Sequence, residues 1–179
     1  MKRRADKRWV ISIVILSIAI SVVFSLVSGQ ALNGTGYVVA FVVLIIFILV
    51  GVLFDIIGVA VQSATEKPFH SMASHKERGA VEALRLLKES DKVSSICNDV
   101  VGDISGIVSG TTAAAIVVNL MRDLSVESAA IQLIVTGLVA GATIGGKALG
   151  KTAAVNNSTQ IVFGVGKIIY FITHAFQKK

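Results

Sequence analysis

Three aspartates interrupt apolar stretches of the chain and are its strongest candidates for chemistry. Asp55 ends one such stretch, and Asp99 and Asp103 lie four residues apart in another. A carboxylate inside a bilayer is costly, so it needs a proton, a helix N-terminus or a cation beside it. At the rise of an α-helix, Asp55 and Asp103 would lie about 16 Å from the nearest charged segment, near the midplane of a membrane.

Oxygen-bearing side chains accompany these acids. Asn98 and Ser105 lie in the stretch that holds Asp99 and Asp103, and Ser63 follows Asp55. Such oxygens suit a hard cation such as Mg²⁺. The alternative is that Ser and Asn bond backbone carbonyls between helices and that some Asp is protonated. We favour this alternative for single Ser and Asn residues, and the ion for the two neighbouring aspartates.

Other kinds of site find little support in the sequence. The chain has one cysteine, Cys97, and its three histidines form no metal-binding pair such as HExxH. It has no P-loop, and we find no nucleophile beside a general base. An enzyme is therefore not expected.

The elements that must position the acids are apolar helices. Hydrophobic residues make up 54% of the 179 residues, mean hydropathy is +0.78, and charged residues are only 16%, against about 25% in soluble domains. Because a spanning helix needs roughly 20 apolar residues, this composition predicts an all-α, polytopic membrane protein of about four spans. The predicted spans are Val10–Val27, Tyr37–Phe54 with an extension to Val61, Val93–Leu120 and Ser128–Gly146.

The positive charges predict an orientation. All but Arg122 of the 17 Lys and Arg residues fall in the N-terminal segment, the segment from Thr65 to Lys92, and the tail. Lys and Arg concentrate on the cytoplasmic side of membrane proteins. We therefore expect four spans in the cell membrane with both termini cytoplasmic. The basic charge then reports topology, and a nucleic-acid partner is not expected.

The first apolar stretch has a second interpretation. A basic start, an apolar run and small residues at Gly29 and Ala31 are typical of a cleaved signal peptide. However, the run from Val10 to Val27 is longer than the usual apolar region of roughly 7–15 residues. We favour a retained helix.

Two further segments are predicted to lie at the membrane surface. Residues 66–92 have apolar residues at helical spacing, and Pro68 suits a first turn. This predicts one amphipathic belt helix, although an ordinary connecting helix in water is the alternative. Ser158–Phe176 is long enough to span, but Lys167 lies in its middle. A charge there is costly, which favours an interfacial helix.

Glycines recur every four residues in two of the predicted spans. Such small-residue stripes let helix backbones approach closely. They could pack the two spans together or form the seam of a dimer. The glycines are Gly102, Gly106 and Gly110 in the third span and Gly137, Gly141 and Gly145 in the fourth.

The chain from about Tyr37 to Phe176 resembles the transmembrane domain of the CNNM/CorB/CorC family of magnesium and cobalt transporters. Four stretches carry the resemblance: GVAVQSA (58–64), RGAVEALRLLKESDK (78–92), SSICNDVVGDISGIVSG (94–110) and GGKALGKTAAVNNSTQIVFGVGKIIYF (145–171). The family's first helix, belt helix, second helix and the segment after its last helix have similar features in the same order.

The resemblance implies a three-span unit with a belt helix that forms a homodimer. In this family Mg²⁺ binds among serine, asparagine and backbone oxygens, and export is thought to be coupled to Na⁺ entry. Ser63 matches the family's serine, and Lys151 matches the lysine after its last helix. Asn98, Gly102 and Asp103 lie in its asparagine-bearing stretch.

The chain also departs from the family pattern. Asp55 and its neighbours replace a stretch rich in small residues and serine, and Gly150 replaces a proline. The family continues into CBS and other cytosolic domains, which we do not expect here. An additional helix precedes the match, so we expect residues 1–36 to hold the extra span and 37–179 the transporter-like domain.

We therefore expect an integral membrane transporter of divalent cations (Mg²⁺ or Co²⁺). The predicted ion ligands are Asp99, Asp103, Asn98, Ser63 and Gly102, and Asp55 is the candidate for coupling to Na⁺ or H⁺. The alternative is a membrane subunit or regulator that does not itself transport, and that assembles with a full-length relative.

Overall fold

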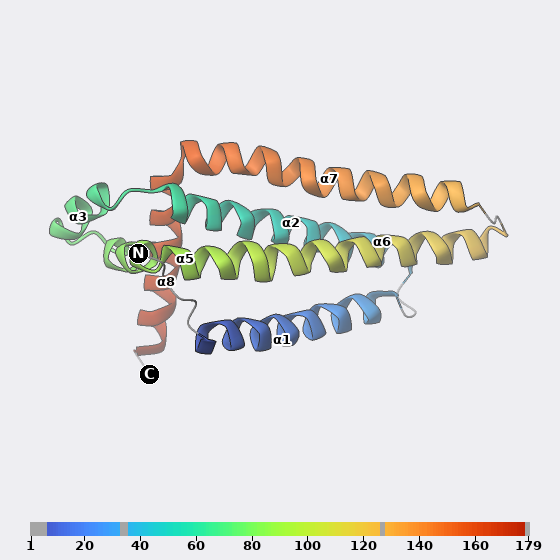
Figure 1. Cartoon of the computed structure of the whole chain (residues 1–179), viewed down its shortest axis with the longest axis horizontal. Helices are drawn as coiled ribbons and strands as arrows, with labels where there is room; N and C mark the ends of the chain where they lie inside the picture. Colours follow the sequence, from blue (N-terminus) through green and yellow to red (C-terminus); the bar gives the residue numbers. More distant parts are fainter. Residues whose placement is uncertain (1–6, 33–35, 126–127, 178–179) are drawn as a thin grey trace. The chain divides into compact units, whose positions relative to one another are not determined.

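A computed structural model describes residues 7–32, 36–125 and 128–177, and these residues are almost all helical, with no strand among them. The helices are α1 (Lys7–Leu32), α2 (Tyr37–Ser63), α3 (Glu66–Ser74), α4 (Ala80–Lys88), α5 (Ser90–Ser94), a π-helix η1 (Ser95–Gly102), α6 (Asp103–Asp123), α7 (Ala129–Asn156) and α8 (Ser158–Gln177) (Figure 1). The predicted all-α class is confirmed. The basic residues Lys2, Arg3, Arg4, Lys178 and Lys179 lie outside the described residues.

Four helical stretches are long and apolar enough to cross a membrane. In lipid a backbone must satisfy its own hydrogen bonds, and long apolar helices do so. These stretches correspond to the four predicted spans, and α8 is not among them within the described part of the chain. Their bounds are Lys7–Gln30, Tyr37–Ser63, Ser90–Asp123 and Ala129–Asn156.

The chain forms two compact units, and three helices contribute residues to both. The first unit comprises residues up to Val52 and Asp99–Gly146, and the second comprises Leu53–Asn98 and Lys147–Lys179.

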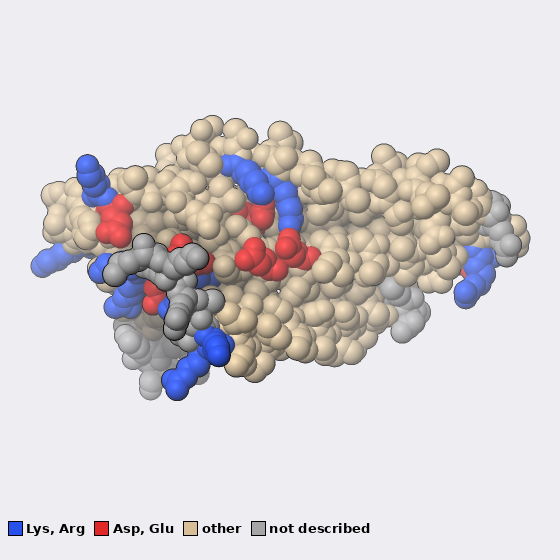
Figure 2. Space-filling model, in the orientation of Figure 1, with Lys and Arg blue, Asp and Glu red and all other residues tan. Residues whose placement is uncertain are grey.

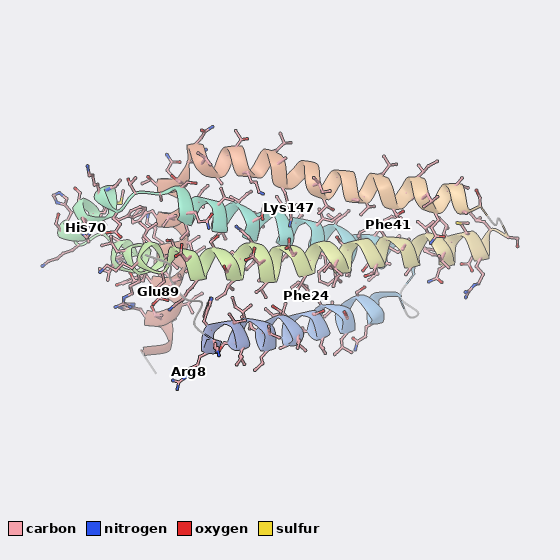
Figure 3. The ribbon with its side chains drawn as sticks, in the orientation of Figure 1. Arg8, Phe24, Phe41, His70, Glu89 and Lys147 are labelled. Atoms are coloured by element: carbon pink, nitrogen blue, oxygen red, sulfur yellow. The ribbon has the colours of Figure 1, made fainter. Side chains whose placement is uncertain are left out.

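The first unit is held together by α1 packed on α6, with the first part of α2 (Figure 1). Phe24 lies on the side of α1 that faces α6 (Figure 3), and its ring is 5.1 Å from that of Phe47, centroid to centroid. Ser28 of α1 and Thr112 of α6 share a buried hydrogen bond of 2.5 Å.

The second unit has its own apolar core. Phe69 of α3, Ala83 and Leu87 of α4 and Val162 of α8 are buried against the last turns of α2. The chain turns at Asn157, so that α8 runs across the direction of the final turns of α7 (Figure 1). These helices carry many of the charged groups visible in Figure 2.

The segment predicted as one belt helix over 66–92 is not continuous. Pro68 lies in the first turn of α3 as expected, where its missing N–H is harmless. The helix ends at Ser74, and a turn with positive φ at Lys76 (58°) and Gly79 (91°) separates it from α4. The prediction of a single helix was wrong because hydrophobic spacing continues through a turn that the left-handed backbone at Lys76 and Gly79 creates.

The fourth long helix extends further than predicted. The predicted span ends at Gly146, but α7 continues to Asn156 and therefore includes Lys147 and Lys151. Lysine is a good helix former, so a charge marks no helix end. This extension places basic groups on the same helix as an apolar span.

Candidate functional site

Asp55 lies on the part of α2 that belongs to the second unit, and its side chain is only 6% exposed. Lys151 of α7 lies beside it, with Nζ 4.0 Å from the Oδ2 oxygen. That oxygen accepts no hydrogen bond from any described residue. A distance of 4.0 Å is the outer limit of an ion pair, and the Lys151 side chain is 58% exposed. The carboxylate is therefore only partly neutralised.

Asn98 supplies a second buried oxygen in the same unit. Its Nδ2 donates to the Ser94 hydroxyl at 3.2 Å, whereas its Oδ1 accepts no hydrogen bond from the described residues. A Cβ at Gly58 of α2 would overlap this Oδ1. The amide therefore occupies the space that any side chain at position 58 would fill, and Gly58 is required for this approach.

Asp55 and Gly58 are three residues apart and share one face of α2. The carboxylate oxygen of Asp55 lies on this face of α2. One turn further along, the amide oxygen of Asn98, a residue of η1, packs against the same face at Gly58. We call these two oxygens the α2 acceptor pair. Each buried acceptor without a donor costs about 1–3 kcal/mol. A bound cation or a proton would remove that cost, and two oxygens suit a hard cation.

The structure does not bring Ser63 to this pair. Its hydroxyl donates to the Val59 carbonyl of its own helix at 2.8 Å, and the residue is exposed. At about 100° per residue, Ser63 also lies about 140° round the helix from Gly58. Ser63 therefore bonds a carbonyl of its own helix, and neither the ion site nor the predicted bond between helices is seen for it.

The other predicted ligands belong to the first unit. Asp99 lies in the π-helix and Asp103 begins α6, and both residues are exposed on the surface of the chain. Gly102 is buried, and its carbonyl lies 3.4 Å from the Cβ that an alanine at position 51 would have. π-helices are rare in proteins, and those that occur are often found at functional sites. Sequence reasoning did not predict it.

Acidic side chains alone do not form a metal centre here. Among the described residues, no group of three or more His, Cys, Asp or Glu side chains is placed to hold a metal ion. A cation site in this chain would therefore need amide, hydroxyl or backbone oxygens beside a carboxylate, which is the composition of the α2 acceptor pair.

Sequence reasoning named Ser105 among the oxygen-bearing residues and matched Lys151 to the family's lysine, but it did not predict what either residue contacts. It expected no basic partner inside the spans, but Lys151 lies beside Asp55. It also gave no role to Gly58, which admits the Asn98 amide. In the first unit, Ser105 is fully buried with an unbonded hydroxyl oxygen, and its Cβ lies 3.0 Å from the Cβ that an alanine at Gly51 would have. In the sequence, these close contacts were indicated only by a glycine within an apolar run, Gly51 near Ser105 and Gly58 near Asn98.

Most glycines of the predicted stripes face no neighbouring helix within the chain, although the Gly102 carbonyl lies close to Gly51 of α2. A Cβ added at Gly106, Gly110, Gly137, Gly141 or Gly145 meets no atom within 4 Å. The possibility that the stripes pack the third and fourth spans together is therefore not supported by the described residues, and the dimer seam stays a prediction.

Comparisons with known proteins add no assignment. No known protein family matches the sequence, and no similar protein was found among characterised proteins or solved structures. The resemblance to the CNNM/CorB/CorC family thus stays a prediction.

Proposed function

We propose that this chain is an integral membrane transporter of a hard divalent cation, Mg²⁺ or Co²⁺, and that the ion contacts the α2 acceptor pair. The observation that carries the proposal is the burial of two oxygens, Asp55 Oδ2 and Asn98 Oδ1, with no hydrogen-bond donor among the described residues. Hard cations bind carboxylate and amide oxygens. Intramembrane acids usually mark an ion pathway.

In this proposal Lys151 promotes release of the bound ion, because its ammonium competes with the ion for Asp55. Its ammonium lies near Asp55 and half outside the core, on a long flexible side chain. A divalent cation at Asp55 would repel that ammonium, so the ion and Lys151 compete for one carboxylate. Entry of Na⁺ or H⁺ at the same carboxylate would give the coupling that the sequence predicted for Asp55.

The direct test uses purified protein in liposomes loaded with a magnesium-sensitive dye. Gly58→Ala is the sharpest variant, because its methyl group displaces the Asn98 amide without changing charge or removing a ligand. Gly164→Ala of α8 is the matched control, since a Cβ there meets no atom within 4 Å and the residue belongs to neither the ion site nor the glycine stripes. We expect transport to fall at least tenfold in Gly58→Ala and Asp55→Asn, which corresponds to about 1.4 kcal/mol, and to persist in the control.

Two outcomes of this experiment would overturn the proposal. Flux equal to that of empty vesicles in the wild type removes the transport function. Normal flux in both Gly58→Ala and Asp55→Asn removes the α2 acceptor pair as the site. Asp99→Ala combined with Asp103→Ala tests the originally predicted ligands separately.

A second candidate function rests on the exposed glycines of α7. Gly137, Gly141 and Gly145 face open space, and the apolar part of α7 is almost entirely exposed within the described chain. Such a face suits a second membrane helix. In this alternative the chain is a subunit that does not transport. Co-purification of a larger membrane partner, lost on Gly141→Leu, supports it, whereas a homodimer without a partner contradicts it.

A further inference from the structure

In the second unit, the turn before α4 and helix α8 cross at two glycines, and this crossing brings two basic residues together. Gly79 adopts φ of 91°, and a Cβ on it would lie 2.6 Å from the Lys167 backbone nitrogen. Gly166 is equally close to the turn, because its Cβ would overlap the Gly79 carbonyl oxygen. Backbone contact at this point places Arg78, the residue before Gly79, beside Lys167 of α8.

An open groove of about 360 Å³ lies at this crossing, lined by Glu77, Arg78, Phe163, Lys167 and Phe171. Lys167 Nζ stands 4.4 Å from the centre of the Phe163 ring, a cation–π contact that holds the ammonium at the groove. Arg78 and Lys167 are both exposed, and neither forms an ion pair with a described residue. The groove thus has two cations, the carboxylate of Glu77 and mainly apolar walls.

An apolar strip continues from the groove along α8. Ile168, Phe171 and Ile172 are 60%, 58% and 52% exposed. They are spaced three and four residues apart, so they share one side of the helix. Val162 and Gly166 are buried on the packed side. Large apolar side chains exposed beside unpaired cations are typical of helices that lie at a membrane surface.

We propose that the groove binds the phosphate of an acidic phospholipid between Arg78 and Lys167, with an acyl chain along Phe171, Ile168 and Ile172. Two cations complement a phosphate, and a soluble anion would have no use for the apolar strip. Glu77, which also lines the groove, can accept hydrogen bonds from headgroup hydroxyls, which makes phosphatidylglycerol the probe of choice. The site does not depend on the proposed transport function.

The test is a lipid titration of the full chain in detergent, read by native mass spectrometry. Phosphatidylglycerol should bind more tightly than phosphatidylcholine. Each basic residue near an anionic lipid contributes roughly fivefold, so Arg78→Gln with Lys167→Gln should weaken phosphatidylglycerol binding roughly 30-fold. The control, Arg85→Gln with Lys88→Gln in α4, removes the same charge at two exposed residues that do not line the groove and should leave binding within a factor of about two.

Three outcomes would overturn the assignment. Equal loss in both double variants would show that only net charge matters. Unchanged binding in Arg78→Gln with Lys167→Gln would remove these residues from the site. Displacement of the lipid by millimolar inorganic phosphate from the wild type would assign the groove to a soluble anion. A circular dichroism spectrum like that of the wild type shows that the variants fold.

Discussion

The crossing of α8 over the turn before α4 allows a sharp prediction about Gly166. In Gly166→Ala the new Cβ would overlap the Gly79 carbonyl oxygen and lie 3.0 Å from the Ala83 nitrogen. Both neighbours are backbone atoms, so no side chain can move aside. Overpacking of this kind costs about 1–3 kcal/mol, and two backbone contacts favour the upper end.

Gly164 in the same helix is the matched control, because a Cβ there meets no atom within 4 Å. Both substitutions gain about 1 kcal/mol of helix propensity, so the difference between the two variants isolates the crossing. We expect about 3 kcal/mol, which is roughly 150-fold in the equilibrium for opening α8 away from α4.

Hydrogen–deuterium exchange of the α8 and α4 amides in lipid nanodiscs measures this opening. Protection should fall in Gly166→Ala and hold or rise in Gly164→Ala. Gly79→Ala should resemble Gly166→Ala, since a left-handed φ costs an L-residue about 1–2 kcal/mol. If Gly166→Ala and Gly164→Ala exchange at the same rate, the close crossing does not exist and the groove beside it is not formed as described.

Two further predictions concern polar contacts. Thr112 donates to the Val108 carbonyl at 2.6 Å and must therefore accept from Ser28. Thr112→Val leaves the Ser28 hydroxyl without its acceptor, whereas Ser28→Ala leaves the Thr112 hydroxyl bonded to Val108. We expect each variant to lower the unfolding free energy by about 0.6–1.7 kcal/mol, with the larger loss in Thr112→Val. Unfolding titrations in detergent measure both losses. Lys151→Met removes the cation near Asp55. Without Mg²⁺ this variant should melt at a lower temperature than the wild type, and Mg²⁺ should raise its melting temperature more.

Either result can fail in a clear way. A larger loss in Ser28→Ala than in Thr112→Val would reverse the assigned donor. An equal response of Lys151→Met and the wild type to Mg²⁺ would show that the ion and the ammonium do not compete at Asp55. Ca²⁺ and Na⁺ titrations run in parallel test whether the response belongs to one ion.

The sequence determined where the long apolar helices lie. Runs such as Tyr37–Ser63 are uninterrupted by proline or glycine clusters, and in lipid a helix is the structure that satisfies the backbone of such a run. The position of Pro68 in a first turn was also predictable, because an N–H there has no partner in any helix. Aspartates within apolar runs were visible as candidates for the same local reason.

Only the tertiary structure decided which residues meet. Asn98 reaches its place because Gly58 has no side chain, and Lys151 reaches Asp55 because α7 continues past the predicted end of the span. The turn at Gly79 similarly separates α3 from α4, with α8 crossing it. Hydrophobic spacing indicates which face of a helix is buried, but it does not indicate which other segment of backbone packs against that face. Close approach at a single glycine depends on that neighbour, so contacts of this kind became visible only once the helices were packed.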